Sequence, residues 1–322
     1  MFAALSYMKR LSILFLFLWA TAAAAFPTKA VKIIVAFPPG GGTDIVARVV
    51  GARLSEIWGQ PVVIENRAGA SGTIGTEAAA RADADGHTLF MATMGNMTAN
   101  QHLYTKMAVD PLRALAPITK VVDVHFVLMA NPSLAASNVR ELIDLAKKKP
   151  GEIAYSSSGP GGAPHLAMEL FKRKAGVDLI HVPYKGSGPS INDLIGGQVM
   201  LTMDSLVQSY PHIKAGRLKA LAVLGPKRTA LLPDVPTVGE TLPGYALTNW
   251  FGLLAPAATP KDVVQKVFLD VKKVLDEPEI KKRIGDLGAD VVGNTPEEFG
   301  DAMRAESQQW AEIIKAAGIR GE

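Results

Sequence analysis

The chain has 322 residues, of which 34 are Lys or Arg, 30 are Asp or Glu and none is Cys. The lack of cysteine excludes disulfides, thiolate metal sites, a cysteine nucleophile and a lipid anchor attached through cysteine. The formal net charge of +4 is too small to indicate a protein that binds nucleic acid or an anionic membrane.

The N-terminal residues have the pattern of a secretion signal. Two basic residues precede an apolar stretch at residues 11–20, and the alanines at residues 23–25 fit a cleavage site. The apolar stretch is shorter than the roughly 20 residues that a spanning helix needs. We therefore predict a signal peptide over residues 1–25 and a mature chain that starts at Phe26, with Met8 as an alternative start of translation. Because the exported protein has no predicted anchor, we expect it in the periplasm of a Gram-negative bacterium.

Strand-like and helical segments alternate after the signal. Predicted strands cover residues 31–37, 62–66, 88–93, 118–122, 126–130, 153–156, 180–184, 199–203, 218–224 and 250–255, and predicted helices cover residues 44–58, 73–81, 164–175, 189–194, 260–275 and 296–317. This alternation favours parallel sheets. The mature chain is longer than one hydrophobic core usually supports, so two domains are expected.

Small and polar residues follow nearly every predicted strand. In the first loop, two prolines and three glycines at residues 38–42 lead into Thr43 and Asp44, where a helical pattern begins. Glycines leave backbone N–H groups unshielded, and a helix N-terminus favours negative charge. Because ligands bind beyond the carboxyl ends of parallel strands, these loops predict a polar cleft that captures a small anionic solute.

The candidate ligand-binding residues come from these strand ends. They are Phe37, Pro39, Gly40, Gly41, Thr43, Asp44, Ala70, Ser71, Gly95, Asn96, Ser157, Ser158, Gly159, Gly162, His165, Tyr184, Lys185, Gly186 and Asp204. Arg67 and Lys185 are the only cations in the predicted cleft loops, so N–H groups, hydroxyls and water are expected to hold the ligand. For Asp44 a helix cap is the favoured interpretation. For Phe37 and Tyr184, core packing and ligand contact have equal weight.

Patterns typical of catalysis and metal binding do not occur. The serines at residues 156–158 lack a Gly-x-Ser-x-Gly context, and the first glycine loop matches neither a dinucleotide fingerprint nor a P-loop. The six histidines form no i, i+4 pair and no His-Glu-x-x-His motif. We predict no catalytic residue, no metal site and no cofactor. A secreted α/β enzyme is the less favoured alternative.

Five ordered motifs resemble those of the substrate-binding proteins of tripartite tricarboxylate transporters, the Bordetella uptake gene (Bug) family. They occupy residues 34–44, 65–75, 165–171, 181–186 and 232–237 and read IVAFPPGGGTD, ENRAGASGTIG, HLAMELF, HVPYKG and LPDVPT. The departures are small: Ala36 stands where proline is frequent, and residues 188–190 differ from the usual x-Pro-Ala.

The resemblance implies the two-lobe α/β fold of type II periplasmic binding proteins, the "Venus flytrap", in which each lobe is a mainly parallel sheet flanked by helices. It implies a discontinuous lobe 1 over residues 26–123 and 247–322, and a lobe 2 over residues 124–246. One ligand carboxylate would bind the loops of lobe 1, and lobe 2 would set specificity.

The implied function is capture of a small organic carboxylate by a periplasmic monomer and delivery of that ligand to a two-component membrane permease. A nucleic-acid partner is not expected. Delivery to a sensor instead of a permease, with the same cleft, is an alternative that the sequence leaves open.

Overall fold

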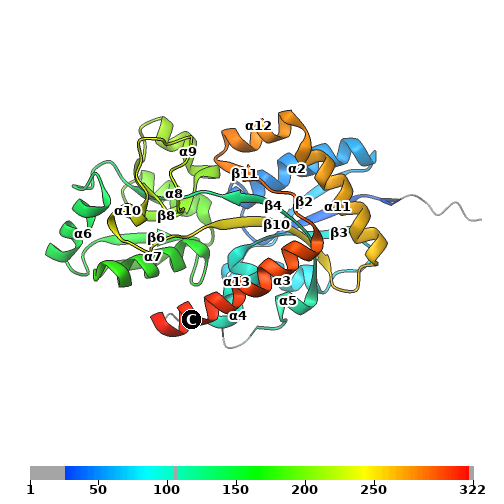
Figure 1. Ribbon diagram of the computed structural model, residues 1–322, viewed down its shortest axis with the longest axis horizontal. Helices are drawn as coiled ribbons and strands as arrows, with labels where there is room; N and C mark the ends of the chain where they lie inside the picture. Colours follow the sequence, from blue (N-terminus) through cyan, green and yellow to red (C-terminus); the bar gives the residue numbers. More distant parts are fainter. Residues whose placement is uncertain (1–25, 105–106, 319–322) are drawn as a thin grey trace, which may run out of the picture.

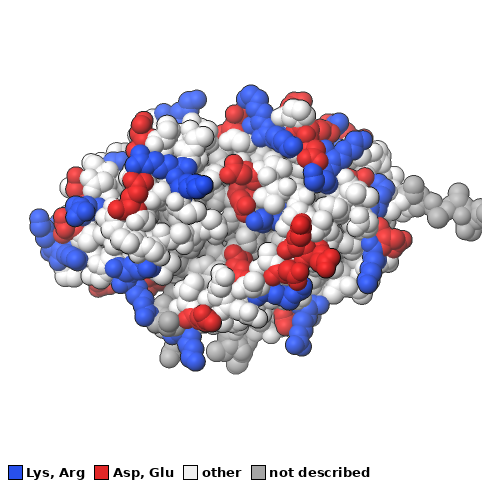
Figure 2. Space-filling model, viewed as in Figure 1, with Lys and Arg blue, Asp and Glu red and all other residues white. Residues whose placement is uncertain are grey.

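The computed structural model describes residues 26–104 and 107–318, and it contains two α/β lobes that lie side by side (Figure 1). The predicted signal peptide lies outside the described residues. Within the described part of the chain, no helix has the length and apolar character needed to cross a membrane. Lys and Arg alternate with Asp and Glu over both lobes on the face in Figure 2, so this face has no basic patch for a polyanion.

The first lobe is built on a sheet with the strand order β11-β4-β10-β3-β1-β2. Its strands are β1 (Val31–Val35), β2 (Val62–Asn66), β3 (Thr88–Thr93), β4 (Leu115–Val124), β10 (Asn249–Pro256) and β11 (Ala289–Val291). Strand β1 pairs in parallel with β2 and β3. Strand β10 is antiparallel to β3 and β4, and β11 is antiparallel to β4.

The second lobe is built on a sheet with the order β7-β6-β8-β5-β9. Its strands are β5 (Phe126–Ala130), β6 (Ala154–Ser157), β7 (Ile180–Pro183), β8 (Leu201–Ser205) and β9 (Lys219–Val223). Strand β6 pairs in parallel with β7 and β8, whereas β5 is antiparallel to β8 and β9.

Both sheets are therefore mixed rather than mainly parallel, which corrects that part of the prediction. Most successive strands that helices connect run parallel, as the alternation predicts, but β5 and β6, which α6 connects, run antiparallel. Every antiparallel pair between the described strands involves β5, β10 or β11. Strands β5 and β10 are the first strands after each passage of the chain between the lobes, and β11 runs in the same direction as β10. Local alternation of strand and helix carries no information about the direction of such strands.

Helices cover both faces of each sheet (Figure 1). They are α2 (Gly42–Trp58), α3 (Thr73–Ala80), α4 (Asn100–Leu103), α5 (Pro111–Ala114), α6 (Val139–Lys148), α7 (Ala163–Ala175), α8 (Ser187–Ile195), α9 (Leu206–Lys214), α10 (Val238–Thr241), α11 (Lys261–Asp276), α12 (Pro278–Asp286) and α13 (Pro296–Ala317). Short turns of 3-10 and π helix cover Ala70–Gly72 and Gly95–Ala99. Each predicted strand and helix has a counterpart, whereas α4, α5, α6, α9, α10, α12 and β11 were not predicted.

Strand β5 illustrates how the two faces are packed. Val127 and Met129 pack with Leu194 and other residues of α8 and α9, while Leu128 and Ala130 belong to the larger core on the opposite face. Successive strand residues point to opposite faces, so a strand that helices cover on both sides is apolar throughout. All five residues of β5 are buried.

The chain passes from the first sheet to the second between Val124 and Phe126 and returns between Val223 and Asn249. The blue and cyan N-terminal segments and the orange and red C-terminal segments consequently share one lobe in Figure 1, together with the yellow strand β10, and the green segments form most of the other lobe. Strands β4 and β10 pair from Asn249 and Val124 to Pro256 and Leu115. This pairing fixes the positions of both connections between the lobes.

Candidate functional site

A cavity with about 420 Å³ of space, part of it open to solvent, lies between the two lobes. We call it the central cavity. The first lobe contributes Phe37, Gly41, Gly42, Thr43, Thr93, Asn249 and Phe251, and the second contributes Phe126, Ser158, Ala163, Pro164, Ser187, Asp204, Ser205 and Gln208. Asp204 is the one ionisable side chain in this lining set, which holds no Lys, Arg or His.

Four helices begin at the central cavity, and three of them have no side-chain cap. Helices α2, α7 and α8 follow Gly41, Gly162 and Gly186, none of which has a side chain to bind the first N–H groups. Helix α9 differs, because the Ser205 hydroxyl accepts a hydrogen bond from the N–H of Val207 at 3.1 Å. Uncapped N-termini carry partial positive charge, so together they favour an anion in the space that they face.

Asp204 lies at the end of β8, on the second-lobe side of the cavity. Its side chain is 2% exposed, and its Oδ1 accepts a hydrogen bond from the N–H of Ser205 at 2.7 Å. Burial raises the pKa of this carboxyl to about 6, although the neighbouring polar groups of Ser187, Ser205 and Gln208 act in the opposite direction. A carboxylate that is buried without a cation is costly, and such groups concentrate at functional sites.

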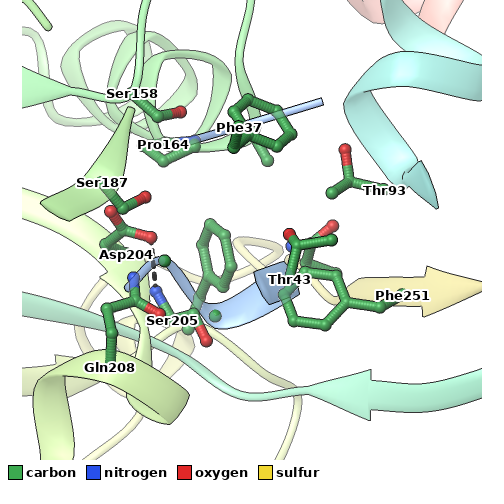
Figure 3. A pocket seen from close by; sticks show the side chains of 15 residues that line it. Phe37, Thr43, Thr93, Ser158, Pro164, Ser187, Asp204, Ser205, Gln208 and Phe251 are labelled. Atoms are coloured by element: carbon green, nitrogen blue, oxygen red, sulfur yellow. Dashed lines mark hydrogen bonds between the residues drawn. The ribbon is translucent and has the colours of Figure 1, made fainter. Parts of the chain in front are cut away.

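Aromatic rings form the apolar part of the cavity wall. Phe37 follows β1, Phe126 begins β5 and Phe251 belongs to β10. Figure 3 shows Ser187, Asp204 and Gln208 along one side, with Thr93 and Phe251 on the opposite side. A ligand with polar ends and a hydrocarbon body therefore fits the distribution of groups.

A second cavity, with about 500 Å³ of space, adjoins the central one through Phe37 and Ser158, which line both. Its other lining residues are Gly69, Ala70, Ser71, Gly72, Gly159, Pro160, Pro183, Tyr184 and Lys185. Lys185 is the one cation in this set. The Tyr184 hydroxyl donates a hydrogen bond to Asp193 at 2.7 Å, so the ring forms part of the wall in a fixed orientation.

The two cavities bring together about half of the predicted site residues. Phe37, Gly41, Thr43, Ser158 and Asp204 line the central cavity, and Ala70, Ser71, Gly159, Tyr184 and Lys185 line the second. Pro39, Gly40, Asp44, Gly95, Asn96, Ser157, Gly162, His165 and Gly186 line neither cavity. Arg67, predicted as a cleft cation, pairs with Glu65 on a surface groove instead.

Asp44 holds the first glycine loop in place. Its carboxylate accepts hydrogen bonds from the N–H of Gly40 at 3.0 Å, from the Arg48 guanidinium at 2.9 and 3.0 Å and from the Asn66 amide at 3.0 Å. Burial opposes the charge on Asp44, but these bonds outweigh it and place the pKa below its ordinary value. The prediction that Asp44 caps the helix is wrong, because the N-cap of α2 is Gly41 and Asp44 lies within the first turn.

Other predicted residues fix the loops that form the walls. Asn96 accepts hydrogen bonds from the N–H and the hydroxyl of Thr93, at 3.1 and 2.9 Å. His165 accepts one from the N–H of Gly161 at 3.0 Å and stacks on His181, with 4.1 Å between ring centroids. The Ser157 hydroxyl contacts the ring of His181 at 2.7 Å. These residues position the walls of the cavities.

Two glycines permit close approach between the lobes. A Cβ atom on Gly42 would lie 2.7 Å from Oε1 of Gln208, in the opposite lobe. A Cβ atom on Gly186, where φ is +124°, would lie 2.5 Å from the ring of Pro38. The glycines of these loops therefore serve contact between lobes as well as the exposure of N–H groups.

Several residues of the central cavity were not predicted from the sequence, and three of them were missed for the same reason. Phe126 starts β5 and pairs with Ser205 at the end of β8, and Phe251 near the start of β10 pairs with Thr93 at the end of β3. Asn249 lies at the same end of β10. Because these strands are antiparallel to their neighbours, their N-terminal ends lie at the sheet edge where only C-terminal ends were searched.

Known proteins identify the family. Residues 46–319 match the family described as "Tripartite tricarboxylate transporter family receptor". The chain belongs to this family. Protein BugT of Bordetella pertussis is 35% identical over 300 residues, which cover 92% of each chain. A protein of Pseudomonas sp. strain P51, named for the tcbD-tcbE intergenic region, is 34% identical over 292 residues, 90% of this chain and 87% of its own.

Solved structures of family members have the same architecture. The periplasmic binding protein BugD is 37% identical with a TM-score of 0.89, over 92% of this chain and 100% of its own. An R. palustris protein solved with adipate is 38% identical, with a TM-score of 0.90 over 92% and 99% of the two chains. MatC from Rhodopseudomonas palustris, with bound malate, is 31% identical, with a TM-score of 0.86 over 90% and 100%.

These relatives confirm the predicted family and the two-lobe α/β fold. The family consists of periplasmic receptors that bind solutes, so the chain is a solute-binding protein and not an enzyme. The enzyme alternative is therefore set aside.

Proposed function

We propose that this protein captures a small organic carboxylate in the central cavity, in the periplasm, and delivers it to a two-component membrane permease. The observation that carries the proposal is the convergence of three uncapped helix N-termini on a cavity between the lobes whose lining holds no Lys or Arg. Backbone N–H groups and hydroxyls then replace a cationic side chain as the partners of the anion.

The position of the ligand follows from the same geometry. Its carboxylate would lie against the first N–H groups of α2 and α7, beside the hydroxyls of Thr43 and Ser158. Its hydrocarbon body would contact the ring of Phe37. Relatives solved with adipate and with malate support this ligand class. The permease partner is supported by the family, whose description names a tripartite transporter.

The proposal includes lobe boundaries at residues 123/124 and 246/247, a signal peptide over residues 1–25 and a monomeric mature protein. The passages of the chain between the two sheets support the boundaries. A cavity between lobes gives a simple transport mechanism, because closure encloses the ligand and opening releases it.

The test is a binding screen on protein purified from the periplasm without unfolding. Mass spectrometry of the solute released on denaturation is expected to show an organic carboxylate. Calorimetric titration of the ligand-free protein is expected to show binding of a narrow set of mono-, di- or tricarboxylates and no binding of their amides. Binding of neutral sugars or cationic peptides, with no carboxylate bound, would contradict the proposal.

A matched pair of variants tests the location. Gly42→Val places a branched side chain against Gln208 and at the start of α2, so the affinity for the carboxylate is expected to fall at least about tenfold. Gly285→Val in α12 is the control, since a Cβ atom there meets nothing within 4 Å. Equal affinities of the two variants would place the ligand elsewhere.

A further inference from the structure

The central cavity contains buried polar atoms that lack partners. Among the described residues, Oδ2 of Asp204, Oε1 and Nε2 of Gln208 and Oδ1 of Asn249 have no hydrogen-bond partner. The three side chains are 2%, 8% and 3% exposed. They come from β8, α9 and β10, so both lobes contribute to the group. We call these four atoms the acceptor group, because three of them accept hydrogen bonds and only Nε2 donates.

Buried polar atoms are almost always paired in native proteins, so an unpaired group calls for an explanation. A ligand carboxylate can accept a hydrogen bond from Nε2 of Gln208, but it cannot pair the three oxygens of the group, because carboxylate oxygens only accept hydrogen bonds. A ligand that supplies hydrogen-bond donors would pair the oxygens of Asp204, Gln208 and Asn249. A hydroxyl supplies one donor without charge, whereas a protonated amine supplies three donors and a positive charge.

The charge in the cavity distinguishes these two donors. Asp204 is the one ionisable residue among those that line the cavity, and no lining cation compensates it. A second carboxylate on the ligand would be repelled by Asp204 in a site of low dielectric constant. An ammonium group would restore neutrality and form a charge-assisted hydrogen bond.

We propose that Asp204 is a specificity-determining residue and that the protein selects carboxylates that also carry a protonated amine. The amine binds Asp204 with Gln208 and Asn249, while the carboxylate binds the N-termini of α2 and α7. This inference rests on the proposed function, since it takes the carboxylate site as given. Figure 3 shows Asp204 and Gln208 on one side of the cavity and Thr93 on the opposite side.

The experiment uses matched ligands that differ in a single substituent at C2. Three carbon skeletons are tested, each with H, OH or NH₃⁺: propanoate, lactate and alanine; succinate, malate and aspartate; adipate, 2-hydroxyadipate and 2-aminoadipate. Affinities for the ligand-free wild-type protein are measured by calorimetric titration. At the chain length that binds best, the amino compound is expected to bind most tightly and the unsubstituted compound most weakly.

Asp204→Asn tests the residue itself. Asparagine keeps an acceptor for the N–H of Ser205 and removes the charge, so circular dichroism is expected to show a native fold. The affinity for the amino compound is expected to fall at least about 30-fold, and the affinity for the unsubstituted compound is expected to stay equal or to rise. Asp144→Asn is the control, because Asp144 is an exposed residue of α6.

The outcomes separate the two proposals. If unsubstituted compounds bind as tightly as amino compounds, or if Asp204→Asn weakens all three members of a series equally, the role of Asp204 is refuted and the proposed function stands. If the hydroxy compound binds most tightly, the acceptor group selects a neutral donor and the amine is refuted. If no carboxylate of the panel binds, the proposed function fails, and this inference fails with it.

Discussion

Replacement of Asp204 by asparagine is expected to stabilise the ligand-free protein. The carboxyl has an ordinary pKa of 3.8 and a folded-state pKa of about 6, because burial disfavours its charged form. One pKa unit corresponds to about 1.4 kcal/mol, so ionised Asp204 costs the folded state about 3 kcal/mol. Asparagine has a similar shape and no charge to bury.

The pH dependence gives the sign of the effect. Below about pH 4, Asp204 is protonated in both the folded and the unfolded state and imposes no penalty. Between about pH 4 and pH 6 the unfolded state loses its proton first, so the stability of the wild type falls relative to the variant. Above about pH 6 both states are ionised and the full penalty persists. Asp204→Asn is therefore expected to be more stable than the wild type at pH 7.5, and this difference in stability is expected to be absent at low pH.

The assay is urea unfolding of both ligand-free proteins at pH 7.5 and at about pH 4. Other ionisable groups titrate in both proteins, so the difference between them isolates Asp204. The denaturation midpoint of the variant is expected to rise at pH 7.5 with an unchanged m-value. Asp144→Asn is expected to change the unfolding free energy by less than about 0.5 kcal/mol. Equal stabilities at pH 7.5, or an advantage of the same size at both pH values, would refute the reasoning.

Three further results are expected. A bound carboxylate at 100 times its Kd should raise the unfolding free energy by about 2.7 kcal/mol, and a melting curve that does not shift would contradict tight binding. Tyr245→Phe removes a buried hydroxyl that donates to Ala167 O at 2.9 Å, so urea unfolding should show a loss of about 1 kcal/mol without a change in affinity. Ser71 and Tyr104 of the first lobe both donate to the carbonyl of Pro160 in the second. Ser71→Ala with Tyr104→Phe should speed ligand release in stopped-flow measurements roughly tenfold, and an unchanged rate would show that these bonds do not hold the lobes together.

The sequence predicted those helices and strands that can be recognised from neighbouring residues alone. Residues 44–58 and 62–66 could be assigned because an apolar period, a following Gly59 and a strand-like run occur together. Helix α6 was missed although Asn138 caps it and Glu141 follows in its first turn. That signal was present in the sequence and was not used.

The sequence also predicted some residues of the central cavity from the loops after parallel strands. Phe37, Ser158 and Asp204 were predicted as ligand contacts in this way, and all three line the central cavity. Residues such as Phe251 could not be found, because their position depends on which strand they pair with and in which direction. Pairing between distant segments, such as β10 with β3, is decided by the whole sheet.

The sequence by itself determined that this chain is α/β, that glycine loops open its helices and that its family binds solutes. Only the tertiary structure decided what each glycine and each carboxylate does there. Asp44 in the first turn of α2 and Asp204 near the end of β8 were both predicted from polar strand ends. Asp44 accepts four hydrogen bonds and has a lowered pKa, while Asp204 has an unpaired oxygen and a raised pKa. The physical reason is that residues four positions away supply three of the bonds to Asp44, whereas its bond from Asn66 and the burial of Asp204 depend on tertiary contacts, which no local pattern records.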